Sequence, residues 1–146
     1  MKQINTIYKF LIFFLIFLFN TSIVYGKGTR FIVLGHMYPI IDDKKKIDNL
    51  FEKINGYNAD YVFILGDSAL QNKKFFTKIN SSINSKVYFT PGNHELKNSK
   101  NDYLENVGYF NKQLIDKDIK FILINSSDNL ESIKEKIKKY LDVSFQ

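Results

Sequence analysis

Apolar side chains follow two patterns along the chain, short continuous runs and stripes of helical spacing. Residues 31 to 34, 61 to 65 and 87 to 89 are runs of aliphatic and aromatic residues, typical of strands covered by other elements. Between these runs, apolar side chains recur every three or four residues and predict two amphipathic helices. The apolar positions are Ile47, Leu50, Phe51 and Ile54 in the first helix and Phe75, Phe76, Ile79 and Ile83 in the second. Strands separated by helices predict right-handed βαβ crossovers, and therefore a parallel sheet in an α/β fold.

The pattern changes after residue 95. A polar stretch to residue 106 predicts a loop with a short helix, and residues 109 to 125 predict an antiparallel hairpin that starts a second sheet. A last amphipathic helix follows, with Asp128 as its expected N-cap and Glu131 three residues further on. We find no internal repeat, proline-rich linker or low-complexity segment after residue 26, so this part is expected to be one domain.

The N-terminus has the layout of a signal peptide. Residues 10 to 19 are an uninterrupted apolar run preceded by Lys2 and Lys9. Ten helical residues rise only about 15 Å, half of a hydrocarbon core of about 30 Å, so a full membrane span is disfavoured. Cleavage is expected after Gly26, and the alternatives are an uncleaved anchor or a buried N-terminal helix. Residues 1 to 26 therefore predict export to the periplasm or the extracellular space, or membrane anchoring through this leader alone.

The amino-acid composition limits the kinds of metal site, nucleophile and partner that the chain can have. The chain has no cysteine, which excludes disulfides, thiolate metal sites and a cysteine nucleophile, so that any metal must be held by oxygen and nitrogen. The formal net charge is +6, carried by scattered lysines interleaved with acidic residues. Arg30 is the single arginine, and phosphate or base readout usually relies on arginine, so nucleic-acid binding is not expected.

Polar motifs follow each of the three predicted strands. They are Gly35-His36-Met37-Tyr38, Gly66-Asp67-Ser68 and Gly92-Asn93-His94-Glu95. Because the carboxyl ends of parallel strands meet at one edge of a sheet, we expect these three loops to converge. Carboxylate, amide and imidazole groups are ligands for divalent metals, and the glycines allow sharp turns beneath them.

The second and third loops resemble the calcineurin-like metallophosphoesterase family. The resemblance implies that Asp67 bridges two metal ions, that Asn93 binds the second ion, and that His94 is catalytic and faces the phosphoryl group of the substrate. It also implies a metallophosphoesterase-type sandwich over residues 27 to 146. The implied activity is hydrolysis of a phosphate ester by a metal-activated water, with divalent ions such as Mn, Fe or Zn as cofactors.

Two departures from the family pattern change this expectation. The first loop offers His36 and Tyr38 where the family has Asp-x-His; His36 could ligate a metal, and Tyr38 could ligate or form a hydrogen bond. His36 and His94 are the only histidines, so the family's later histidine motifs are missing. We therefore expect a truncated sandwich with a weakly held metal at His36, Asp67 and Asn93. An incomplete second sheet also predicts exposed apolar surface and self-association.

Other interpretations of the loops remain open. Gly66-Asp67 could be a simple helix N-cap, and the loop from Gly92 to Glu95 a simple turn, with His94 on the surface and Glu95 supporting the loop. Residues 66 to 70 resemble the Gly-Asp-Ser-Leu block of serine esterases, which would make Ser68 a nucleophile, although no histidine follows residue 94. A third hypothesis is a non-catalytic fragment or a degenerate relative that binds metal weakly.

Overall fold

Three parallel strands form the centre of the protein, in the order β1-β2-β3. The structure is a computed structural model that describes residues 28 to 141, so the predicted leader lies outside the described residues. The strands are β1 (Phe31–Gly35), β2 (Tyr61–Leu65) and β3 (Lys86–Thr90), and they pair in parallel register, as predicted. The other elements, in chain order, are η1 (Tyr38–Ile40), α2 (Lys44–Gly56), α3 (Lys73–Ser82), α4 (Asn93–Val107), β4 (Lys112–Asp116), β5 (Ile119–Leu123) and α5 (Leu130–Leu141).

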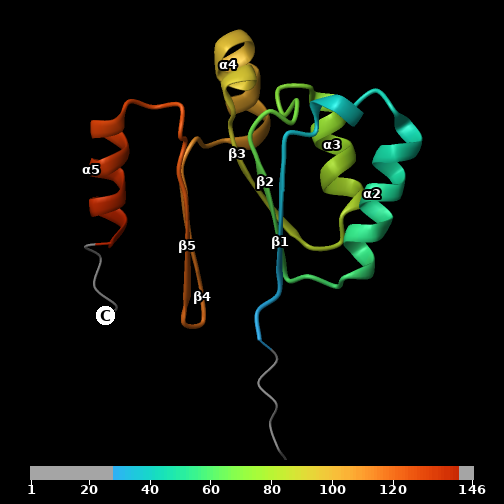
Figure 1. Cartoon of the computed structure of the whole chain (residues 1–146), viewed down its shortest axis with the longest axis horizontal. Coiled ribbons are helices and arrows are strands. Elements are labelled where there is room, and N and C mark those ends of the chain that lie inside the picture. Colours follow the sequence, from blue (N-terminus) through green and yellow to red (C-terminus); the bar gives the residue numbers. More distant parts are fainter. Residues whose placement is uncertain (1–27, 142–146) are drawn as a thin grey trace, which may run out of the picture.

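Helices α2 and α3 cover one face of this sheet (Figure 1). Val62 and Ile64 of β2 are buried against Ile47 and Phe51 of α2 and against Ile79 of α3. Burying an aliphatic side chain of this size contributes about 1.5 to 3 kcal/mol, so the predicted stripes stabilise the helices through packing. Each helix also has a capping side chain at its start: the N-cap residues Asp43 and Asn72 accept hydrogen bonds from backbone N–H groups of the first turn.

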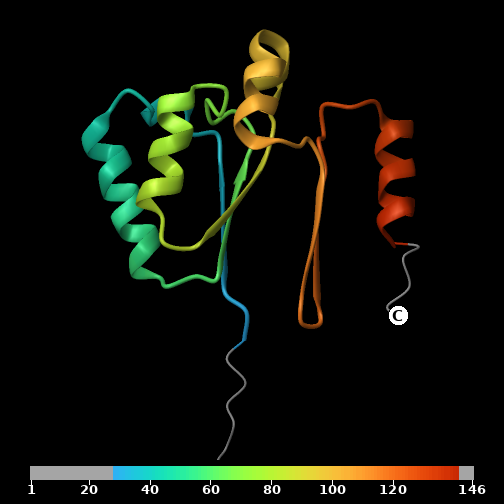
Figure 2. The same cartoon turned by 180° about the vertical axis from the view of Figure 1, so that it is seen from behind.

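The hairpin of β4 and β5 covers the opposite face, as Figures 1 and 2 show from two sides. Tyr61 and Phe63 of β2 pack there against Phe121 and Leu123 of β5, and the rings of Phe63 and Phe121 lie 4.9 Å apart. The antiparallel hairpin is therefore the predicted second sheet, and β2 is covered on both faces. This mixed architecture is that of a metallophosphoesterase-type sandwich.

Strand β1 differs from the expectation that it is covered on both faces. Phe31 and Val33 are 53% and 51% exposed, and Leu65 at the end of β2 is 41% exposed. The ring of Phe121 in the hairpin contacts that of Phe31 at a centroid distance of 5.6 Å, but this contact leaves about half of Phe31 exposed. The sheet therefore has an uncovered apolar strip on the hairpin side, where exposed apolar surface was expected.

Two local predictions are wrong. The polar stretch after residue 95 is not mainly loop but continues α4 to Val107, with a kink at Ser99, whose φ is −155° and ψ 45°. The N-cap of α5 is Asn129 and not Asp128, because Asn129 Oδ1 accepts the hydrogen bond from the backbone N–H of Ser132 at 2.9 Å. Asp128 instead accepts from the side chain of Asn125. Within residues 28 to 141, no helix is long and apolar enough to span a membrane.

Candidate functional site

The loops that follow β1, β2 and β3 are joined edge to edge by backbone hydrogen bonds. The N–H of His36 donates to Gly66 O at 3.2 Å, and the N–H of Gly66 donates to Thr90 O at 2.9 Å. Further along, the N–H of Tyr38 donates to Asp67 O at 3.3 Å. The strand ladder thus continues into the loops, and the predicted convergence of the three motifs is confirmed.

Asp67 is the centre of this convergence. Its Oδ1 accepts a hydrogen bond from the backbone N–H of His94 at 3.0 Å, and its Oδ2 lies 3.7 Å from Nδ1 of His36. The amide group of Asn93, with its nitrogen turned toward Asp67, donates to the two carboxylate oxygens at 3.0 and 3.2 Å. The three predicted metal ligands therefore lie together, with His36 and Asn93 beside the carboxylate of Asp67. Asp67 has a φ of 48°, a conformation that costs a non-glycine residue on the order of 1 kcal/mol.

Two glycines allow the loops to approach this closely. A Cβ atom on Gly92 would lie 2.3 Å from Oδ1 of Asp67 and 2.4 Å from its backbone nitrogen. A Cβ atom on Gly66, whose φ is 40°, would lie 2.8 Å from the Cα of Gly92. Any other residue at these two positions would have to displace the ligand-bearing backbone.

The two histidines lie on the outside of the site, and Tyr38 supports one of them. The ring of Tyr38 packs against that of His94 with a centroid separation of 5.0 Å. The Tyr38 hydroxyl accepts a hydrogen bond from Nε2 of Gln71 at 2.7 Å. Of the two roles considered for Tyr38, ligand or hydrogen-bond partner, the structure shows the second. His94 and His36 both have exposed side chains.

The family assignment follows from a comparison with family models. The model described as calcineurin-like phosphoesterase matches residues 24–143. The chain belongs to the calcineurin-like phosphoesterase family. Comparisons with curated proteins and with solved structures give no match. The loops that suggested this family from the sequence are the same loops that meet at Asp67.

A cavity of about 590 Å³ opens beside Asp67 in this calcineurin-like phosphoesterase. His36, Asp67 and Asn93 contribute to its lining. The lining also contains side chains that the sequence analysis did not single out, namely Thr90, Ile122, Ile124, Ser126 and Ser127. Ser126 and Ser127 follow shortly after β5. A pair of polar residues after a predicted strand was therefore the sequence signal that could have identified them as part of the cavity. The cavity therefore combines the metal-type ligands with hydroxyl groups and an apolar wall.

The serine-esterase interpretation of residues 66 to 70 is wrong on geometric grounds. Ser68 is fully buried, and its hydroxyl donates to Gly66 O at 2.9 Å while accepting from the N–H of Met37 at 3.4 Å. A nucleophile must reach a substrate and a base, and this hydroxyl is held by the backbone. The interpretation of Asp67 as a helix N-cap is also wrong, because α3 is capped by Asn72.

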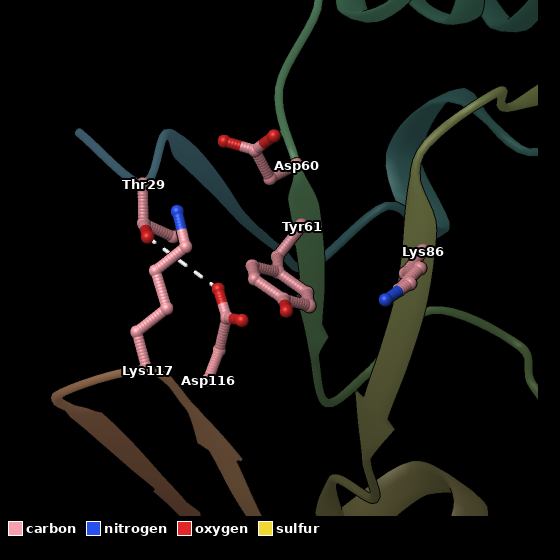
Figure 3. Close-up of a pocket in the computed structure, with 6 residues that line it drawn as sticks. All are labelled: Thr29, Asp60, Tyr61, Lys86, Asp116 and Lys117. Carbon is pink, nitrogen blue, oxygen red and sulfur yellow. Dashed lines mark hydrogen bonds between the residues drawn. The ribbon is translucent and has the colours of Figure 1, made fainter. Parts of the chain in front are cut away.

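A second cavity, of about 260 Å³, lies at the opposite end of the sheet, between the strand starts and the hairpin turn (Figure 3). Asp116 accepts there from the hydroxyl of Thr29 at 3.4 Å. Burial, and after it the Asp116 carboxylate, raises the pKa of the Tyr61 phenol, and Nζ of Lys86 lies 5.6 Å from the centre of the Tyr61 ring. These contacts join the hairpin to the sheet, so we interpret this cavity as structural.

The metal-binding capacity of the family site is limited. No group of three or more histidine, aspartate or glutamate side chains that could hold an ion occurs between residues 28 and 141. The set at Asp67 consists of one carboxylate, one imidazole and one amide, from three different loops. These groups fit a single ion with mixed oxygen and nitrogen ligands, but they do not provide a second full set.

Proposed function

We propose that this protein binds one divalent cation at Asp67 and acts on a phosphate ester in the adjoining cavity. The observation that carries the proposal is the convergence of His36, Asp67 and Asn93 beside a cavity of about 590 Å³. Membership of the phosphoesterase family supports a phosphate ester as the class of substrate. The cavity, with hydroxyl groups and an apolar wall, has room for the organic part of such an ester.

The chemistry of the donor set fits a metal ion of intermediate softness. The end group of Asn93 lies 3.0 and 3.2 Å from the Asp67 oxygens; it can face them through its nitrogen without an ion, or share an ion with them through its oxygen. One carboxylate, one imidazole and one amide suit Mn, Fe or Zn, and three donors hold such ions more weakly than the usual four or more. A bound ion would polarise a phosphoryl oxygen and activate a water.

His94 has the position and chemistry of a proton donor. Its side chain is exposed, its ring rests on that of Tyr38, and its backbone N–H is held by Asp67. An imidazole changes its protonation near neutral pH and can donate a proton to a leaving oxygen. We assign His94 this role, which places the proton donor beside the proposed metal ligand.

One observation favours a second candidate function, a metal-binding relative without turnover. The paired ions that clamp a phosphoryl group in two-metal sites need two sets of donors, and the described residues contain no cluster of three or more histidine, aspartate or glutamate side chains that could hold an ion. In that case the protein binds a cation at Asp67 but does not hydrolyse a phosphate ester. The two candidates therefore differ in turnover and agree in metal binding.

The experiment that separates them is hydrolysis of an aryl phosphate by the full chain with added Mn²⁺. We expect slow, metal-dependent turnover that is absent in Asp67→Asn. His94→Ala should lower the rate about 100-fold, because general acid catalysis contributes at least this much. Asp102→Asn, at an exposed acidic residue of α4, is the matched control and should leave the rate unchanged. Equal turnover in Asp67→Asn would contradict the proposal, and metal binding without any turnover would favour the non-catalytic candidate.

We also propose that the protein is exported, on the strength of the apolar run at residues 10 to 19 and the basic residues before it. Cell fractionation followed by N-terminal sequencing tests this. The expected result is an exported protein that begins at Lys27, or an intact chain in the membrane fraction if the leader is retained. An intact chain in the cytoplasmic fraction would refute the proposal.

A further inference from the structure

We infer that Glu95 is a positioning residue that holds Asp67 in place for metal binding. Its side chain is 0% exposed, although glutamate is rarely buried without a partner. The carboxylate accepts three backbone hydrogen bonds: Oε1 from the N–H of Ser68 at 2.7 Å, and Oε2 from the N–H groups of Asp67 and Gly92 at 2.9 and 2.8 Å. One side chain thus joins the loop after β2 to the loop after β3.

The arrangement requires a carboxylate of this length. Two successive N–H groups that point to one side form a site for an anion, and Asp67 and Ser68 provide such a pair. Glutamine at position 95 offers one acceptor oxygen and would turn an NH₂ donor toward a backbone N–H. Aspartate is one methylene shorter and cannot keep all three bonds at 2.7 to 2.9 Å.

Glu95 affects the site indirectly, by fixing the position of Asp67. Glu95 does not line the cavity beside the metal-type ligands, so it is not in the position of a ligand. By fixing two consecutive N–H groups it holds Asp67 at its φ of 48°, and that conformation directs the carboxylate toward His36, Asn93 and the N–H of His94. Replacement of Glu95 should therefore disturb a site that it does not touch.

The test compares wild type, Glu95→Gln and the matched control Glu105→Gln, an exposed glutamate of α4 that lies 3.6 Å from Lys73. The first readout is the NMR signal of the His94 amide, which reports the Asp67 carboxylate directly. The second is Mn²⁺ affinity, which rests on the proposed function. We expect Glu95→Gln to shift the His94 amide and to weaken Mn²⁺ binding roughly tenfold or more, as outer-shell partners do. Glu105→Gln should change neither.

A folded Glu95→Gln variant with an unshifted His94 amide, or with Mn²⁺ affinity within about twofold of wild type, would overturn the inference. If the wild type itself binds no Mn²⁺, the proposed function fails, while the His94 amide still tests Glu95. If Glu95→Gln does not fold, Glu95→Asp keeps the charge but not all three hydrogen bonds, and it should shift the His94 amide and weaken Mn²⁺ binding relative to wild type. In the wild type, the amides of Asp67, Ser68 and Gly92 should exchange slowly with solvent, and exchange as fast as in open loops would also overturn the inference.

Discussion

Glycines, which bear no functional side chain, determine how much space surrounds Asp67. Gly92 lies so close to it that a single added carbon would meet both its backbone nitrogen and its carboxylate. The sequence predicted that the loops bearing Asp67, Asn93 and His94 converge, because the carboxyl ends of parallel strands meet at one edge of a sheet, and the structure brings them together. It could not predict that Tyr38 binds Gln71 or that Ser68 is buried, because these outcomes depend on how the loops fold over one another.

Gly92→Ala is therefore expected to damage the site without removing a ligand. The new Cβ would overlap Asp67 at 2.3 and 2.4 Å, so Asp67 must move. We expect a loss of about 1 to 3 kcal/mol in the free energy of unfolding, the usual cost of overpacking. Urea denaturation measures this. The control is Gly56→Ala, where nothing lies within 4 Å of the added atom, and it should be neutral or slightly stabilising. Equal stability of the two variants would contradict the account of Gly92.

At the scale of elements, amphipathic spacing decides which helices are predictable. The stripes of α2 and α3 contain their buried residues, so both helices were found from the sequence. Helix α4 was predicted only as a short helix within a loop, because its sequence is largely polar and its stability depends on contacts at each end. Glu95 bonds the N–H of Gly92 at its start, and Tyr103 is buried near its end, where its ring stacks on Phe110 at 5.7 Å. These contacts come from tertiary structure, which spacing does not encode.

Tyrosines around α4 predict a loss of stability in alkali. Burial raises the pKa of Tyr103, with Tyr109 and Glu95 adding to the effect, and burial also raises the pKa of Tyr109. The folded state then keeps a proton that the unfolded chain releases near pH 10, so stability is full below about pH 10 and falls as pH rises. One proton kept in this way corresponds to a slope of at most about 1.4 kcal/mol per pH unit.

The variant Tyr103→Phe isolates this effect. The Tyr103 hydroxyl is buried without a hydrogen-bond partner among the described residues, so removing it should stabilise the protein by about 1 kcal/mol near pH 7. The loss of stability above pH 10 should become less steep by about one proton. Urea denaturation between pH 7 and 11 measures both. An unchanged alkaline slope in Tyr103→Phe would show that Tyr103 does not carry the effect.

At the scale of the whole molecule, most of the features that the sequence predicted follow from the order and pairing of the strands. Parallel pairing of β1, β2 and β3 brings three loops to one edge, which is why the convergence of the three motifs was predictable from their order after the strands. The hairpin was also predicted, together with exposed apolar surface beside an incomplete second sheet, and Phe31 and Val33 are half exposed there. The contribution of Ser126 and Ser127 to the cavity follows from where the hairpin docks on the sheet, a long-range packing result.

Calorimetric titration of the full chain with Mn²⁺ measures whether one divalent cation binds at Asp67, as we propose. We expect weak binding of one ion per chain, and no binding in Asp67→Asn. His36→Ala and Asn93→Ala should each weaken it roughly tenfold or more, because each removes one of three donors. Undiminished binding in Asp67→Asn, or tight binding of two ions by the wild type, would contradict the account.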